Sequence, residues 1–167
     1  MIKINNKNKR KIVSCLILGL VVVLILVVVA TGLHNNWFDN EKVVLDDKYY
    51  CSDGCENSLI DLSDLEYEKL IDDNESFLIF VDQSGCNTAD DMRGFVESYS
   101  SKNGIKFYRM MYEDLHSSTL HEQVKFYPSV VVVENGRIKN FLKADSDEDK
   151  NAYEDYEFFE KWLDRYL

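Results

Sequence analysis

Residues 77–86 read Phe-Leu-Ile-Phe-Val-Asp-Gln-Ser-Gly-Cys, and this stretch decides the fold class. Its first five residues form an apolar run without polar alternation, which is typical of a strand covered on both faces, as in an α/β sheet. Polar and small residues then end the strand, and Cys86 follows them. From Ala89 to Tyr99, apolar residues recur at spacings of three and four, which predicts a helix that begins close to Cys86.

Strand and helix signals alternate on both sides of this stretch. A short strand is predicted over residues 59–62, and Ser63 and Glu66 after it have the spacing of a helix capping box. A further strand is predicted over residues 105–111, and Ser118 or Thr119 is expected to begin a short helix. Before these elements, residues 42–50 form a shorter run with strand-like composition.

The C-terminal third predicts a hairpin followed by a helix. Residues 129–133 are strongly β-branched, and the Asn135-Gly136 pair after them is a strong hairpin signal. The partner strand is predicted over residues 137–143, a solvated acidic loop over 145–149, and one apolar-striped helix from Tyr153 onward. The order β-α-β-α-β-α-β-β-α places parallel crossovers first and an antiparallel hairpin last, so the predicted class is α/β with a mixed central sheet.

The N-terminus predicts a membrane segment. Residues 12–33 are almost all apolar and would span about 33 Å as a helix, enough for a hydrocarbon core of about 30 Å. The basic tail over residues 1–11 predicts a cytoplasmic N-terminus and an extracytoplasmic C-terminal domain on a single-pass cell-membrane protein. The alternative is a cleaved signal peptide, although signal peptides have shorter apolar regions of about 7–15 residues.

The charge distribution excludes nucleic acid as a partner. All 30 acidic residues lie after position 38, whereas five of the 19 basic residues precede the apolar run. Binding to a phosphate backbone requires clustered Lys and Arg, which the acidic remainder of the chain does not offer.

The segment order and three motifs make residues 59–167 resemble the thioredoxin fold. Residues 77–86 resemble its apolar strand, short loop and nucleophilic cysteine, residues 127–130 its cis-proline segment, and residues 131–137 its closing hairpin. The resemblance implies that a cis Tyr127–Pro128 bond packs against Cys86 and that the backbone of Tyr127 faces an extended peptide substrate. With the N-terminal anchor, the chain resembles a membrane-tethered extracytoplasmic thioredoxin-like protein of a bacterium.

The chain also departs from the thioredoxin pattern at the motif. Thioredoxins carry Cys-x-x-Cys because the second thiol attacks the mixed disulfide that the first one makes. Here the motif is Cys-Asn-Thr-Ala, with Ala89 at the second position, Gly85 in place of the usual Trp and Phe80 in place of the buried acid. The helix N-terminus favours the Cys86 thiolate, whereas Asp90 and Asp91 oppose it. Cys86 is therefore either a working monothiol or an unused remnant of the fold.

Cys51 and Cys55 lie in the extension over residues 34–58 and have three interpretations. Their spacing lets them form a structural disulfide, since Cα atoms four residues apart in a turn reach the required separation of about 5.5 Å. If the extension folds back over Cys86, one of the two could instead resolve a Cys86 mixed disulfide. A soft metal site is the third interpretation, but the three histidines are scattered, and we expect no metal and no cofactor.

Two hypotheses for the function follow. In the first, the tethered domain engages thiols or disulfides of exported proteins through Cys86, as a thiol–disulfide oxidoreductase that lacks the second active-site cysteine. In the second, it is a non-catalytic binding or accessory module of a secretion, bacteriocin or conjugation system, and its partners are components of a membrane complex. Retention of Cys86 favours the first hypothesis, and loss of the second cysteine favours the second.

Overall fold

The computed structural model describes residues 19, 21–23, 42–51, 55 and 57–167, which belong to two units, Met1–Glu41 and Lys42–Leu167. In the first unit the described residues are helical. The predicted cytoplasmic tail over residues 1–11, the rest of the predicted membrane segment over 12–33 and residues 34–41 lie outside the described residues. No helix in the described part of the chain is long and apolar enough to cross a membrane.

The second unit is built on a five-stranded mixed sheet with the strand order β1-β3-β2-β4-β5. β3 pairs in parallel with both β1 and β2, whereas β4 runs antiparallel to β2 and to β5. The strands span β1 Leu59–Asp61, β2 Phe77–Asp82, β3 Phe107–Met111, β4 Ser129–Glu134 and β5 Arg137–Phe141. The predicted α/β class with a mixed central sheet is therefore confirmed.

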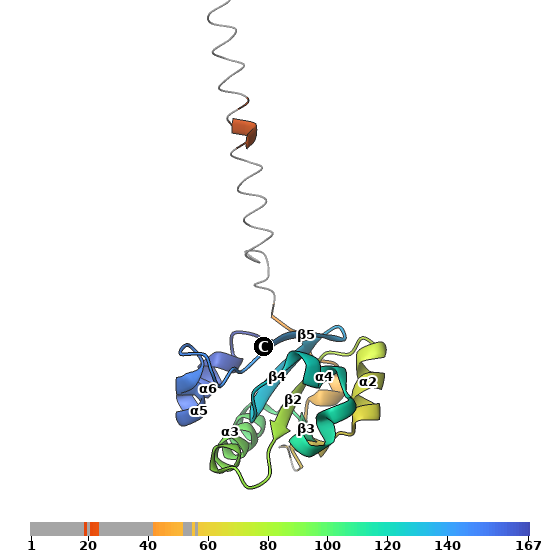
Figure 1. Cartoon of the computed structure of the whole chain (residues 1–167), viewed down its shortest axis with the longest axis vertical. Coiled ribbons are helices and arrows are strands. Elements are labelled where there is room, and N and C mark those ends of the chain that lie inside the picture. The colour runs from red at the N-terminus through yellow and green to blue at the C-terminus, as the bar shows by residue number, and fades with distance from the viewer. Residues whose placement is uncertain (1–18, 20, 24–41, 52–54, 56) are drawn as a thin grey trace, which may run out of the picture. The chain divides into compact units, whose positions relative to one another are not determined.

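Helices cover both faces of this sheet. Figure 1 shows α3, α5 and α6 on one side of the sheet and α2 and α4 on the other. The helices span α2 Asp64–Asp72, α3 Asn87–Asn103, α4 Thr119–Gln123, α5 Lys150–Glu154 and α6 Tyr156–Leu163, with short 3-10 turns η1 Asp47–Tyr49 and η2 Tyr112–Ser117.

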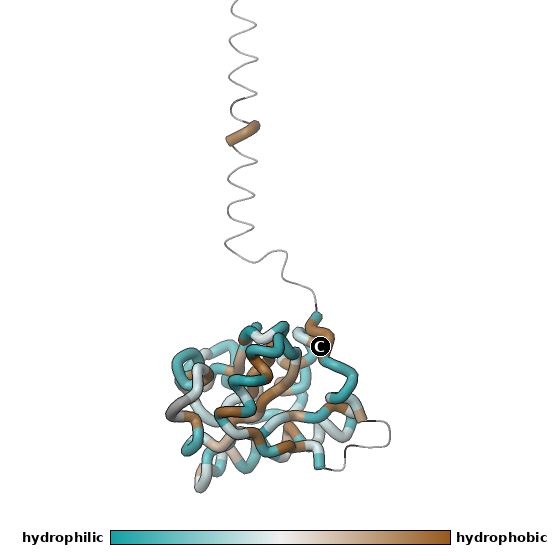
Figure 2. The backbone as a smooth tube through the Cα atoms, turned by 90° about the vertical axis from the view of Figure 1, so that its right-hand side faces the viewer, coloured by the Kyte–Doolittle hydropathy of each residue, from teal (hydrophilic) through white to brown (hydrophobic). Residues whose placement is uncertain are grey.

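The central strand β2 has the environment that its sequence predicts. All six of its residues are buried, because β3 and β4 flank it and helices lie over both faces. Hydrophobic residues appear as brown stretches of the tube in Figure 2. A continuous apolar run thus places the residues that follow it, including Cys86, at the carboxyl end of a rigid central strand.

Local signals set several boundaries of these elements. Ser63 and Glu66 form the predicted capping box at the start of α2, since each side chain bonds the other residue's backbone N–H. α3 ends at Gly104, whose φ of 65° lies in the left-handed region that favours glycine. The β4–β5 hairpin turns at Asn135 and Gly136, which both have positive φ, as a tight two-residue hairpin turn requires.

The predicted single C-terminal helix is wrong, because the chain forms two helices separated by Asp155. This residue has extended backbone angles, and its side chain accepts a hydrogen bond of 2.7 Å from the N–H of Glu157. Aspartate is a preferred N-cap residue, so it begins a new helix here in place of continuing the previous one. The acidic loop before α5 is also not wholly solvated, since the buried Asp149 accepts a hydrogen bond from the Lys143 N–H.

The strand-like run over residues 42–50 adds no strand to the sheet. Val43 and Leu45 are buried, and the Val43 N–H donates to the Tyr166 carbonyl at 2.6 Å. The chain then forms η1 and makes an isolated bridge between Tyr50 and Ile105. The alternation of buried and exposed residues reflects an extended chain that packs on the domain, so this part of the extension contributes to the core.

Candidate functional site

Cys86 lies at the junction between β2 and α3. Its backbone forms the N-cap of α3, where its carbonyl accepts a hydrogen bond of 3.1 Å from the Asp90 N–H. Gly85 before it has a φ of 69°, a left-handed conformation that lets the chain turn sharply into the helix. The Cys86 side chain is half-buried and is the free thiol among the described residues. The predicted placement of Cys86 at a helix N-terminus is therefore confirmed.

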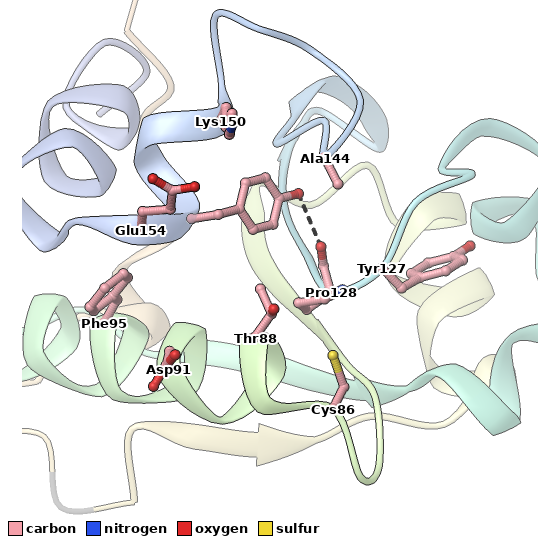
Figure 3. A pocket seen from close by; sticks show the side chains of 10 residues that line it. Cys86, Thr88, Asp91, Phe95, Tyr127, Pro128, Ala144, Lys150 and Glu154 are labelled. Atoms are coloured by element: carbon pink, nitrogen blue, oxygen red, sulfur yellow. Dashed lines mark hydrogen bonds between the residues drawn. The ribbon is translucent and has the colours of Figure 1, made fainter.

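The Tyr127–Pro128 bond is cis, as the resemblance implies. It lies between α4 and β4, and Pro128 lines the same pocket as Cys86. Figure 3 shows the Cys86 sulfur directed toward the Pro128 ring. Two of the three segments that carry the resemblance are therefore adjacent, although they are separated by about 40 residues of sequence.

A pocket of about 770 Å³ opens around these two residues. It lies between α3, the cis-proline segment and α5. Its walls combine the sulfur with aromatic, small and charged side chains. The lining residues are Cys86, Thr88, Asp91, Phe95, Tyr127, Pro128, Ala144, Lys150, Tyr153 and Glu154.

Tyr153 supports the cis-proline segment from α5. Its hydroxyl lies 3.0 Å from both the Pro128 and the Leu142 carbonyl oxygens and shares its one proton between them, and Figure 3 shows the first of these contacts. Burial, together with the nearby Asp149 carboxylate, raises the pKa of Tyr153 above its ordinary value, so the hydroxyl keeps its proton. From the sequence, Tyr153 is only one residue of an apolar helix stripe, and no local signal marks its contact with Pro128.

The Tyr127 side chain points away from Cys86 toward α4 (Figure 3). Its hydroxyl donates to the Val124 carbonyl at 2.5 Å, and its ring lies 4.8 Å from that of Tyr112. Burial raises the pKa of Tyr127 to about 12, with a smaller contribution from Tyr112. In the described part of the chain, the backbone N–H and carbonyl of Tyr127 have no hydrogen-bond partner. An extended peptide can therefore pair with this backbone.

Arg93 neutralises part of the negative charge at the start of α3. Its guanidinium donates twice to the buried Asp82 carboxylate, at 2.9 and 3.0 Å, and once to Asp90 at 2.9 Å. These hydrogen bonds, that to Asp82 above all, raise the pKa of Arg93, so the cation is permanent. Of the two carboxylates expected to oppose a Cys86 thiolate, Asp90 is thus paired and only Asp91 lines the pocket.

Two of the three positions at which the motif departs from thioredoxins are fully buried. Ala89 and Phe80 are both 0% exposed, whereas Gly85 is exposed, and the chain carries neither a second thiol at position 89 nor an acid at position 80. The buried acid of β2 is Asp82, which is 1% exposed and held by Arg93. The Asp82–Arg93 pair cannot be predicted from the sequence, because an ion pair between a strand end and a helix has no local signature.

Cys51 and Cys55 form a disulfide, with Cα atoms 5.6 Å apart. The Cys51 N–H donates to the carbonyl of Gly104, the C-cap of α3, at 2.8 Å. Cys86 lies at the opposite end of this 17-residue helix, which is about 25 Å long. The structure therefore brings Tyr127 and Pro128 to Cys86 but not the Cys51–Cys55 pair. Within the described residues, no group of three His, Cys, Asp or Glu side chains is placed to hold a metal ion.

Thioredoxins are among the solved structures that share this architecture. A thioredoxin of Schistosoma mansoni superposes with a TM-score of 0.50 at 15% identity, covering 65% of this chain and 98% of that one. This chain has a thioredoxin-like fold. A variant thioredoxin from Halobacterium salinarum superposes with a TM-score of 0.51 at 11% identity over 67% and 94% of the two chains. The thioredoxin NaTrxh of Nicotiana alata superposes with a TM-score of 0.51 at 13% identity, covering 65% of this chain and 92% of that one.

The likeness is one of fold. No protein-family model matches the sequence, and no curated protein matches it. The thioredoxin-like domain places Cys86, the cis-Pro128 and the closing hairpin in the relative positions that the sequence resemblance implies.

Proposed function

We propose that this chain is a membrane-tethered, extracytoplasmic thioredoxin-like protein that engages thiols or disulfides of exported proteins through Cys86. The observation that carries the proposal is the free thiol at the N-terminus of α3, directed toward the cis-Pro128 within a pocket. The thiolate is the nucleophilic form of cysteine and the form that takes part in the proposed exchange. The pocket gives a client access to the sulfur.

The chemistry is thiol–disulfide exchange with a single protein thiol. The Cys86 thiolate attacks one sulfur of a client disulfide, a Cys86–client disulfide forms, the client S–S bond breaks, and the second client sulfur leaves as a thiolate. Because Ala89 replaces the second cysteine of the motif, the domain has no adjacent thiol that could resolve the mixed disulfide, and a thiol from another molecule or from the client must do so. A client thiol or a small-molecule thiol then restores the free Cys86 by the same exchange.

The client is held as an extended strand. The backbone N–H and carbonyl of Tyr127 are free to pair with it, and Tyr153 fixes the adjacent Pro128 through a hydrogen bond. Main-chain pairing of this kind selects an extended backbone and leaves the choice of side chains to the rest of the pocket.

The location rests on the sequence and on the disulfide. The basic tail and the apolar residues 12–33 support a single-pass anchor in the lipid bilayer with a cytoplasmic N-terminus. The Cys51–Cys55 disulfide is in keeping with an oxidising compartment outside the cytosol. Intact mass spectrometry of the membrane fraction tests the anchor. Full-length protein is expected, whereas a mature chain that begins after residue 30 identifies a cleaved signal peptide.

A second candidate function is a non-catalytic binding or accessory module of a secretion, bacteriocin or conjugation system. The observation that favours it is the buried Ala89, since the motif has no thiol that could release a trapped client. In this case the pocket at the cis-proline segment holds a peptide of a membrane-complex component, and Cys86 takes no part.

A trapping experiment distinguishes the two functions. The full-length chain carries Cys15→Ser, which removes the cysteine of the predicted membrane segment over residues 12–33. In detergent, it is mixed with a short peptide whose cysteine carries an aryl disulfide. The proposal predicts release of the aryl thiolate and a peptide adduct mapped to Cys86, both absent after Cys86→Ser. Peptide binding that persists after Cys86→Ser, with no adduct in the parent, supports the accessory module and contradicts thiol exchange.

A further inference from the structure

We infer that the end of the pocket remote from Cys86 binds a basic side chain of the client, about two to four residues from the client's reactive cysteine. This inference rests on the proposed function and specifies its substrate class. The binding site is formed by Asp91, Phe95 and Glu154, which we call the acidic arm of the pocket.

The acidic arm has an aromatic floor between two carboxylates. Asp91 and Phe95 are one turn apart on α3, and Glu154 lines the same pocket from the end of α5 (Figure 3). The Phe95 ring is half-buried and lies 5.9 Å from the rings of both Tyr156 and Phe159. The apolar stem of an Arg or Lys can therefore rest on Phe95 while its charged end meets the carboxylates.

Both carboxylates are available to a ligand. Asp91 and Glu154 have no hydrogen-bond or ion-pair partner in the part of the chain that the structure describes, whereas the neighbouring Asp90 is paired with Arg93. Lys150 lines the pocket one turn before Glu154 on α5 and lies away from Asp91 in Figure 3. The two carboxylates outnumber the one ammonium group of Lys150, so the acidic arm keeps a net negative charge.

The helix gives the distance between the reactive sulfur and the arm. Asp91 and Phe95 follow Cys86 by five and nine residues, which corresponds to about 8 and 14 Å along the α3 axis. An extended peptide advances about 3.3 Å per residue. A side chain in the arm therefore belongs to a residue about two to four positions from the cysteine that reacts with Cys86.

The negative charge of the domain as a whole also favours basic client segments. All 30 acidic residues lie after position 38, in the part of the chain that contains the pocket. A negative field attracts cationic segments and repels anionic ones, and its main effect is on the rate at which a client associates. An acidic small-molecule thiol is correspondingly a poor competitor for Cys86.

A peptide series tests the inference in the full-length Cys15→Ser chain. Short peptides with one aryl-disulfide cysteine carry Arg, Ala or Glu about three residues away, and a further peptide carries Arg beside the cysteine. The measured quantity is the second-order rate of aryl thiolate release. We expect the distant Arg to react about fivefold faster than Glu, since two exposed ion pairs contribute modestly each. We expect the adjacent Arg to show a smaller advantage.

Matched variants assign the preference to the acidic arm. Asp91→Asn with Glu154→Gln should abolish the Arg preference, and Lys150→Gln should increase it. Asp72→Asn with Asp73→Asn makes the same change in charge at the C-terminal end of α2, across the sheet, and should leave the preference intact. Equal rates for Arg, Ala and Glu peptides, or a preference that both double variants reduce equally, overturn the inference and leave the proposed function standing. No reaction with any peptide refutes both.

Discussion

At the scale of single residues, the cis-proline segment depends on a side chain that lies far from it in sequence. The Tyr153 hydroxyl is buried and shares its one proton between the Pro128 and Leu142 carbonyls. Leu142 keeps a second donor in Ser129 at 2.8 Å, so loss of the hydroxyl affects the Pro128 carbonyl most.

We predict that Tyr153→Phe lowers the free energy of unfolding by about 1–2 kcal/mol, because a buried carbonyl loses its donor. Urea unfolding measures this change. Tyr156→Phe is the control, since its hydroxyl bonds the Glu160 carboxylate at 3.2 Å in a less buried setting, and its cost should be under about 0.5 kcal/mol. Equal costs for the two variants would contradict a supporting role for Tyr153.

We predict that substitution by alanine has opposite effects on stability at two glycines. Gly136 has a φ of 69°, and a Cβ there would lie 2.3 Å from the Ile71 carbonyl oxygen, so Gly136→Ala should destabilise the domain by about 2 kcal/mol or more. Gly94 is exposed within α3 with open space around it, so Gly94→Ala should stabilise the domain by about 0.5–1 kcal/mol. Thermal unfolding of the two variants beside the parent checks both signs, and a tolerated Gly136→Ala would refute the close packing of the hairpin turn.

At the scale of elements, Glu75 fixes the segment that precedes β1. Its carboxylate accepts hydrogen bonds from Lys48 at 2.6 Å and from the Tyr49 hydroxyl at 2.5 Å. Burial alone would raise the pKa of Glu75, but the bonds from Lys48 and Tyr49 outweigh it and hold that pKa below its ordinary value of 4.5. The folded state therefore favours the ionised carboxylate.

The lowered pKa of Glu75 determines how its contribution to the stability of the domain changes with pH. Because the folded pKa of Glu75 is depressed, its contribution to stability is present above pH 4.5 and is lost as the pH falls through the folded value. Glu75→Gln should lower stability at pH 7 by about 1 kcal/mol and make the loss of stability on acidification shallower. Urea midpoints across this range test the prediction against the exposed control Glu122→Gln. An unchanged acid dependence in Glu75→Gln would show that the bonds do not stabilise the anion.

The disulfide belongs to a different element from the pocket. Cys51 and Cys55 close a short loop at the far end of α3, so Cys51→Ser with Cys55→Ser should cost about 2 kcal/mol of stability by the chain-entropy relation. The alkylation rate of Cys86 in the folded variant should be unchanged. A Cys86 disulfide with Cys51 or Cys55, identified by mass spectrometry in the parent chain, would instead show that the pair resolves Cys86.

The sequence predicts those elements whose cause is local. The run at Phe77–Asp82, the capping box at Ser63 and the turn at Asn135 each carry their signal within a few residues. The sequence does not predict the break at Asp155, because the apolar stripe continues across it. For the site, the resemblance to the thioredoxin fold predicts Cys86, Tyr127 and Pro128. The walls of the pocket come from α3 and α5, and packing between distant helices leaves no local pattern.

At the scale of the whole molecule, the free thiol and the disulfide lie at opposite ends of α3. The carboxyl end of β2 carries Cys86, which faces the cis-Pro128 and opens into a pocket with an unpaired acidic arm. At the other end of α3 the disulfide and η1 attach the N-terminal extension to the core. This division leaves the thiol as the one feature on which the proposed activity depends.

The most direct test of the account is the alkylation rate of Cys86 in the folded full-length chain, mapped by mass spectrometry with and without a bound client peptide. We predict that Cys86 reacts at neutral pH while the domain stays folded, that a mixed disulfide with the peptide blocks the reaction, and that Cys51 and Cys55 remain joined throughout. If Cys86 reacts only after the domain unfolds, the thiol is not accessible to clients and the proposed exchange chemistry is wrong.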